Sequence, residues 1–74
     1  MPNRFSTIIE KDKHGYYTFC PELEGCHSQG DTMDEAIENM KEAIALYLET
    51  MTKDEITQLA DRQLFTTTLE VNVA

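Results

Sequence analysis

Residues 30–51 read GDTMDEAIENMKEAIALYLETM, and this stretch decides the fold because it predicts one long amphipathic helix. Thr32, with Glu35 three residues later, forms the capping-box pattern with which many helices begin. Apolar residues then recur with the spacing of a single helix face, at positions 36, 37, 40, 43, 44, 47, 48 and 51. Charged residues hold most of the opposite face, so we expect the apolar side of this helix to cover another layer of secondary structure.

The segment before this helix predicts three short β-strands. Residues 4–11 carry the β-branched and aromatic side chains typical of a first strand, and residues 16–20 (YYTFC) form its return partner. Residues 12–15 (DKHG) between them have the Asp and Gly of a hairpin turn. Pro21 ends the second strand because it has no amide hydrogen to donate, and a short third strand is expected at 26–29.

The segment after the long helix predicts a short helix and a last strand. Thr52 with Glu55 is a second capping pattern, and the helix it begins is expected to end near Ala60. Residues 65–73 (FTTTLEVNV) alternate with a period of two, which predicts a strand with one buried face. The order is therefore β-β-β-α-α-β, an α+β fold with the long helix on one face of a small mixed sheet. The chain has room for one domain, residues 1–74.

The predicted sheet offers apolar side chains to both of its faces. Ile8 and Ile9 are neighbours on a strand and therefore point to opposite faces. The second strand divides its apolar residues in the same way, with one face taking Tyr16 and Cys20 and the other taking Tyr17 and Phe19. One helix layer covers only one face, so we expect self-association into a homodimer or tetramer through the open face or an edge strand. The alternative is a half-exposed sheet whose tyrosine hydroxyls reach solvent.

The charge of the chain indicates what kind of partner it suits. It has 14 Asp and Glu against 6 Lys and Arg, a formal net charge of −8. Such a chain repels phosphate backbones, so direct binding of nucleic acid is not expected, whereas a basic protein partner is favoured. Acidity for solubility alone is the alternative interpretation. No apolar run is long enough to span a membrane and the N-terminus does not resemble a signal peptide, so we expect a cytoplasmic protein.

Residue types that could bind a metal are present, but their spacing is poor. Cys20, Cys26, His14 and His27 are possible zinc ligands. Cys26 and His27 are adjacent, so on a strand they point to opposite faces, and no close pair of cysteines exists. We therefore expect no metal or cofactor, and two free thiols as is usual for cytoplasmic proteins.

The sequence also argues against catalysis. Ser28 and His27 are adjacent on a predicted strand, so their side chains diverge and cannot form a nucleophile and its base. Glu10 and Glu70 could share the open face of the sheet, but the helix glutamates could not join them there to hold two metal ions. We predict that the protein is not an enzyme. Metal-dependent cleavage of RNA that is lost on changing Glu10 or Glu70 would contradict this.

Residues 17–44 resemble the HicB antitoxin family. The match is carried by the spacing Y-x-x-C-P-E-L-x-G-C-x-S-x-G-D-T-x-x-E-A-x-x-N-x-x-E-A-I, in which Glu24 stands where Pro is commonest and Asp34 replaces a frequent Glu. The resemblance implies a partial RNase H-like fold with the final strand beside the first. It also implies the antitoxin of a type II toxin–antitoxin pair, which binds and occludes a small basic HicA-like toxin that cleaves mRNA.

Two aspects of this resemblance stay open in the sequence. Many family members carry a C-terminal module that binds the promoter, and nothing follows the last predicted strand here, so autoregulation through DNA is uncertain. The alternative function is a binding or structural module of the same fold without a cognate toxin.

The candidate toxin-binding residues lie in two segments. In the loop after the second strand, Glu22 and Glu24 flank Leu23, so an apolar anchor with two carboxylates could meet a basic groove. The structural alternative puts Leu23 in the core beside a backbone shaped by Pro21 and Gly25. The other candidates, Asp31 and Asp34, also complement the dipole of the long helix. Asn39 is expected to bond backbone carbonyls of a neighbouring loop.

Overall fold

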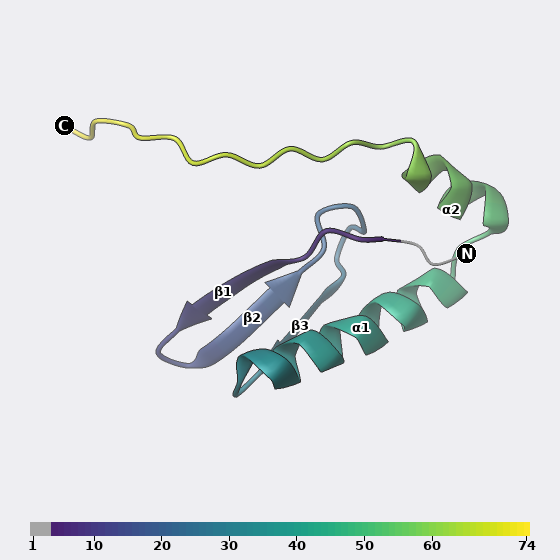
Figure 1. Cartoon of the computed structure of the whole chain (residues 1–74), viewed down its shortest axis with the longest axis horizontal. Coiled ribbons are helices and arrows are strands. Elements are labelled where there is room, and N and C mark those ends of the chain that lie inside the picture. The colour runs from purple at the N-terminus through teal and green to yellow at the C-terminus, as the bar shows by residue number, and fades with distance from the viewer. Residues whose placement is uncertain (1–3) are drawn as a thin grey trace.

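The computed structural model describes residues 4–74 and has the α+β class that the sequence predicts (Figure 1). Three antiparallel strands lie in the order β1-β2-β3 and are followed by two helices. Their bounds are β1 Ile8–Asp12, β2 Gly15–Phe19, β3 His27–Gly30, α1 Met33–Glu49 and α2 Lys53–Ala60. Every strand pair in these residues is antiparallel, so the prediction of a mixed sheet is wrong.

The hairpin and the division of side chains between the two faces follow the prediction. Asp12 Oδ1 accepts a hydrogen bond from the amide of His14 at 2.8 Å, which closes the turn between β1 and β2. Ile9 pairs with Thr18 and Ile8 with Phe19, so each pair shares a face. Thr18 is fully buried under α1, which packs mainly on β2 and β3. Ile8 and Phe19 therefore lie on the open face.

The core is small and lies between α1, the sheet and the loop after β2. Its fully buried apolar side chains come from a few positions: Cys20, Leu23, Cys26, Ala36 and Met40. Gly30 allows α1 to approach the end of β3, because a Cβ at Gly30 would lie 2.5 Å from the backbone nitrogen of Ala36. The close approach of helix to strand therefore depends on the absence of a side chain at this position.

Both helices begin at the predicted caps, but the two caps differ. Thr32 Oγ1 accepts from the amide of Glu35 at 3.1 Å, and only this half of the predicted capping box is formed at α1 in the described structure. At α2 both bonds are present, from the Glu55 amide to Thr52 Oγ1 at 3.1 Å and from the Thr52 amide to Glu55 Oε1 at 2.9 Å. The carboxylate of Glu35 is therefore available for another contact.

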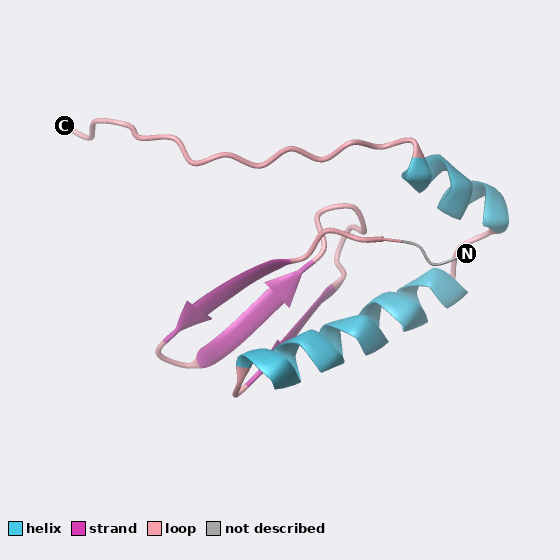
Figure 2. Cartoon of the chain, in the orientation of Figure 1, coloured by secondary structure: helices cyan, strands magenta, loops and turns pink. Residues whose placement is uncertain are grey.

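The prediction of a final strand is wrong. Residues 63–74, called the C-terminal arm below, are extended but pair with no strand of the described chain, and they run back past the β1 side of the sheet, separated from it (Figures 1 and 2). Phe65 is 84% exposed and Val73 is 91% exposed. An alternating pattern shows which side chains a segment can bury, but a strand forms only where another strand supplies its hydrogen bonds. In this structure the arm has no such neighbour, so the return strand of an RNase H-like sheet is missing.

Candidate protein-binding surfaces

The two groups of candidate toxin-binding residues lie at opposite ends of the sheet. The loop after β2 follows Phe19, which pairs with His27, whereas Asp31 follows Gly30, which pairs with Tyr16 near the hairpin turn. β2 lies between these ends, and five residues of strand span roughly 13–17 Å at about 3.3 Å per residue. Glu22 and Glu24 therefore belong to one surface, and Asp31 and Asp34 to another.

Leu23 packs in the core, as its structural interpretation expects. Its side chain is only 2% exposed, and its backbone closes the loop through bonds to Cys20 and Cys26 at 3.1 and 3.0 Å. Gly25 has a φ of +79°, the left-handed conformation that this tight loop needs. Because the Leu23 side chain is buried, a partner that binds this surface cannot contact it. Leu23 is therefore not a candidate for the apolar anchor.

The two carboxylates of this loop have different surroundings. Glu22 Oε1 accepts from the amide of Ser6 at 2.6 Å, and the Glu22 carbonyl accepts from Arg62 Nη1 at 3.4 Å. Glu22 thus joins the segment before β1 to the end of α2, a structural role that sequence analysis missed because both partners are remote in sequence. Glu24 is exposed and remains the candidate contact on this surface.

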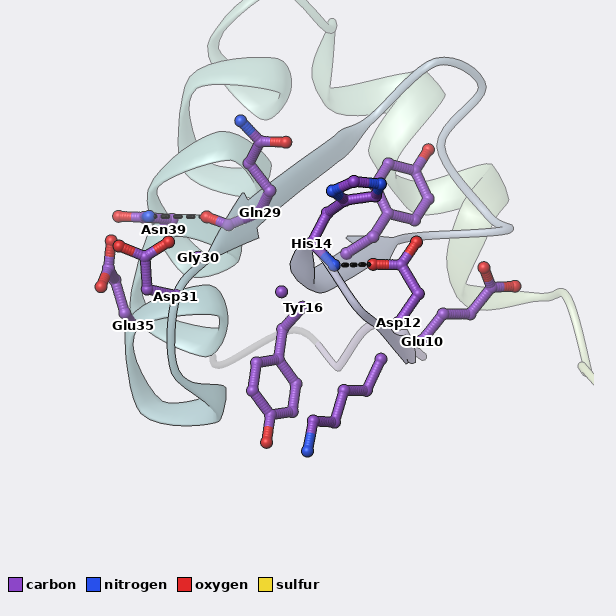
Figure 3. Close-up of a pocket in the computed structure, with 12 residues that line it drawn as sticks. Glu10, Asp12, His14, Tyr16, Gln29, Gly30, Asp31, Glu35 and Asn39 are labelled. Atoms are coloured by element: carbon purple, nitrogen blue, oxygen red, sulfur yellow. Dashed lines mark hydrogen bonds between the residues drawn. The ribbon is translucent and has the colours of Figure 1, made fainter.

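A second surface, the acidic groove, lies between the hairpin and the start of α1 (Figure 3). It has a volume of about 560 Å³. Four carboxylates line it, from Glu10, Asp12, Asp31 and Glu35, against a single lysine, Lys11. In Figure 3 the Asp31 and Glu35 side chains lie together at one side, and Asp12 and Glu10 lie at the other. The groove therefore presents negative charge from two separate elements to one space.

Only one of the candidate residues from the sequence lines the acidic groove. Asp31 is part of it, whereas Asp34 is exposed on the first turn of α1 outside the lining. Glu10, Asp12 and Glu35 were missed as binding residues. The register of the predicted hairpin could have indicated Asp12. Asp12 pairs with Gly15, and the next residue, Tyr16, pairs with Gly30 at the end of β3, so Asp12 lies near the start of the acidic segment at Asp31.

A hydrogen bond fixes one wall of the acidic groove. Asn39 Nδ2 donates to the carbonyl of Gln29 at 2.8 Å, which ties α1 to β3. Asn39 thus bonds a backbone carbonyl as expected, but the acceptor lies on strand β3 and not in a loop. The ring of Tyr16, which lies under the Lys11 ammonium at 5.6 Å, covers part of the opposite wall. The groove is thus held open between α1 and the hairpin.

A third surface, the aromatic face, is the side of the sheet opposite α1. Tyr17 is 41% exposed, and its ring centroid lies 6.0 Å from that of Phe19 and 5.8 Å from that of His27. Ile8 shares this face through its pairing with Phe19. Aromatic side chains with one exposed side are enriched in protein–protein interfaces, so this face can supply apolar contact.

The thiols are in a state that does not favour chemistry. Cys20 and Cys26 are both free and buried, as the sequence predicts. Burial raises the pKa of the Cys26 thiol, and the neighbouring Cys20 raises it further. A raised pKa keeps the thiol neutral, and the neutral thiol is a poor nucleophile and metal ligand.

The described residues also hold no group of three or more His, Cys, Asp or Glu side chains placed to bind a metal. Glu70 lies on the C-terminal arm and Glu10 on β1, and the arm is held away from the sheet (Figure 1). The two carboxylates considered for nuclease chemistry are therefore not brought together. None of the helices in residues 4–74 is both long and apolar enough to cross a membrane.

Comparison with known proteins places the chain in a family. Residues 5–70 match the family described as the HicB-like antitoxin of bacterial toxin–antitoxin systems. A UPF0150 protein of Helicobacter pylori is 42% identical over 69 residues, which are 93% of this chain and 96% of that protein. A UPF0150 protein of Synechocystis is 54% identical over 48 residues, which are 64% of this chain and 61% of that relative, less than two thirds of its length.

A third relative and the structural comparison complete this picture. A UPF0150 protein of Archaeoglobus fulgidus is 53% identical over 47 residues, 62% of this chain and 68% of that protein. No solved structure matches the chain. Because the family match runs from the segment before β1 into the C-terminal arm, this chain belongs to the HicB-like antitoxin family.

Proposed function

We propose that this protein is the antitoxin of a type II pair, and that it binds and occludes a small basic HicA-like toxin that cleaves mRNA. The acidic groove on a chain of this family is the observation that carries the proposal. It is a concave, exposed site lined by four carboxylates, two on each side, and a lysine or arginine of a partner could enter it. The protein acts by covering the toxin, without catalysis, in the cytoplasm where mRNA is found.

Charge governs the approach of the two proteins in this proposal. The net charge of −8 steers a basic partner toward the chain and accelerates association at low salt. Asp31 and Glu35 then meet cationic side chains of the toxin, and Asp34 adds negative charge beside them. Exposed ion pairs each contribute about 0–1 kcal/mol, so carboxylates alone cannot hold a tight complex.

Apolar contact supplies the remaining affinity. The aromatic face offers Tyr17 and Phe19, and tyrosine is one of the residue types that dominate binding energy in interfaces. Glu24, at the other end of the sheet, is proposed as a contact at the edge of this interface. We therefore expect groove variants to change the rate of association and its salt dependence, and variants of Tyr17 to change the rate of dissociation.

The experiment pairs this protein with the product of any small basic reading frame found next to its gene. The variant Asp31→Asn/Glu35→Gln removes two charges from the acidic groove, and Glu38→Gln/Glu42→Gln removes two from α1 outside the groove as the matched control. The Glu35 side chain does not cap α1, so the groove variant should fold. We expect association roughly tenfold slower at low salt for the groove variant, within the range that steering provides, and little change for the control.

Two results would contradict the proposal. Equal binding by the groove variant and the control would remove the acidic groove from the interface. Failure of the wild-type chain to bind the neighbouring protein or to relieve its toxicity would favour a module without a cognate toxin.

A further inference from the structure

A small hollow, called the aromatic hollow below, lies on the open face of the sheet beside the loop after β2. Its lining includes Tyr17, Phe19, His27 and Glu24. It has a volume of about 280 Å³, whereas small-molecule sites usually have roughly 300–1,000 Å³. The hollow is therefore of a size that suits one side chain of a protein partner better than a free ligand.

The ring of Tyr17 is the part of the hollow best suited to a cation. Tyr17 is 41% exposed, and its ring is inclined by 33° to that of Phe19 and by 31° to that of His27. In edge-to-face packing the edge of one ring covers the electron-rich face of another, and these inclinations are far from that perpendicular arrangement. Neither neighbour therefore places its edge on the face of Tyr17, which stays available to a positive charge.

The other tyrosine of β2 already has a cation over its ring. The Lys11 ammonium lies 5.6 Å from the centroid of the Tyr16 ring, within the distance of about 6 Å at which a cation is attracted to an aromatic face. Tyr16 and Tyr17 are neighbours on a strand, so their rings lie on opposite faces of the sheet. No lysine or arginine within residues 4–74 takes the same position over Tyr17. A cation for this ring would have to come from another molecule.

Two carboxylates flank the Tyr17 ring. Glu10 pairs directly with Tyr17, which puts their Cβ atoms roughly 4.5–5.5 Å apart on the open face, and Glu24 lines the hollow from the loop. Both are exposed, and neither belongs to the one ion pair of the described residues, which joins Lys41 and Glu38. These carboxylates and the net charge of −8 favour a positively charged occupant over a neutral or acidic one.

We infer that the aromatic hollow binds an arginine side chain of a protein partner, with the guanidinium stacked on Tyr17 between the carboxylates of Glu10 and Glu24. A guanidinium is planar, so it can lie on a ring while its N–H groups point sideways to a carboxylate. A lysine ammonium is a compact and strongly hydrated charge that cannot stack in this way. The hollow therefore selects arginine over lysine.

The inference rests on the proposed function for the identity of the partner, a basic toxin, and adds the kind of side chain that the toxin would use. Tyr17 lines the acidic groove as well as the aromatic hollow. A partner that places basic residues in the groove therefore lies next to the hollow, where it can insert an arginine.

A titration with a single arginine tests the site without any toxin. N-acetyl-arginine methylamide is added to the isotope-labelled full chain at constant ionic strength and followed by NMR. Exposed contacts of this kind are weak, so we expect a dissociation constant on the order of 10 mM, with the largest shifts at the rings of Tyr17 and Phe19 and at the Glu24 amide. The citrulline derivative has nearly the same shape without the charge and should give no saturable shift. The lysine derivative should bind about threefold more weakly or worse.

Two variants with matched controls separate the hollow from general attraction to an acidic chain. Tyr17→Leu removes the ring and should weaken arginine binding about threefold or more, as the loss of an exposed cation–π contact does, whereas Phe65→Leu removes an exposed ring of the C-terminal arm and should leave it unchanged. Glu24→Gln should also weaken binding, and Glu49→Gln removes an exposed charge at the end of α1 as its control. Tyr17→Phe keeps a ring and should bind arginine as the wild type does. Amide spectra check that each variant is folded.

Three outcomes would overturn the inference. Equal binding of the arginine and lysine derivatives, with shifts confined to the acidic groove, would assign the attraction to charge alone. Unchanged binding in Tyr17→Leu would remove the ring from the site, and the absence of any saturable shift at the hollow would remove the site itself. Toxin binding without arginine binding would contradict only the hollow, whereas arginine binding without toxin binding would support the hollow and contradict the proposed function.

Discussion

Thr18 is a buried polar residue without a hydrogen-bond partner. It is fully buried beneath α1, and its Oγ1 has no partner in the described structure. A buried hydroxyl that leaves water without a new bond costs about 1–3 kcal/mol. Nothing in the sequence marks this position as unusual, because Thr is a common strand residue and its burial depends on how α1 packs.

Replacing this hydroxyl with a methyl group should stabilise the protein. We expect Thr18→Val to raise the free energy of unfolding by about 1 kcal/mol, because Val keeps the shape and removes the unsatisfied oxygen. Urea unfolding measures the change. Thr18→Ser is the matched control, since it keeps the hydroxyl and removes the methyl, and it should lower the stability. A loss of stability in Thr18→Val would show that the hydroxyl has a partner in solution.

Cys26 gives the protein a sensitivity to alkaline pH. Its pKa in the folded state is raised from the ordinary 9.0 by burial and by Cys20, so the unfolded chain loses this proton first. The contribution of Cys26 to stability is complete below pH 9 and is lost as pH rises through the folded pKa. Urea unfolding between pH 8 and pH 10.5 should show a steeper fall for the wild type than for Cys26→Ala. Equal slopes would contradict the prediction.

At the scale of the elements, patterns among neighbouring residues predicted the turn and the helices, whereas features that depend on distant residues were predicted wrongly or missed. The hairpin turn, the long helix and the Thr52 capping box were predicted from neighbouring residues and are confirmed. The final strand was predicted wrongly because its pattern cannot say which strand lies beside it. The acidic groove was missed for a related reason, since its walls come from the hairpin and α1, which only the packing of α1 on β2 and β3 brings together.

The contact between β3 and α1 depends on Gly30. A Cβ at this position would lie 2.5 Å from the Ala36 nitrogen and 2.9 Å from its Cα, and backbone cannot move aside as a flexible side chain can. We expect Gly30→Ala to destabilise the fold by about 1–3 kcal/mol, as overpacking does in other cores. Urea unfolding measures this, with Ser28→Ala on the same strand as the control. Wild-type stability in Gly30→Ala would mean that α1 sits farther from β3.

At the scale of the whole molecule, the sign of the charge was evident from composition, but its placement was not. The sequence indicates Asp31 and Asp34 because they precede and begin the helix, and Glu22 and Glu24 because they flank Leu23. The fold separates these pairs and gives Glu22 a structural bond to Ser6 instead. The two segments therefore lie at two ends of the sheet, where Asp31 lines the acidic groove and Glu24 lines the aromatic hollow of about 280 Å³.

The net charge predicts opposite effects of salt on folding and on partner binding. The chain has one ion pair among its described residues, between exposed Lys41 and Glu38 at 3.4 Å, so salt has little attraction to weaken within the fold. It screens the mutual repulsion of 14 acidic residues, because the screening length falls from about 10 Å at 0.1 M to about 3 Å at 1 M. Thermal unfolding of this protein without a partner should therefore shift to higher temperature as NaCl rises, whereas affinity for a basic toxin should fall roughly tenfold or more. If salt instead destabilised the protein, attraction between charges would outweigh repulsion in the folded chain, and the acidic surface would serve the fold itself before any partner.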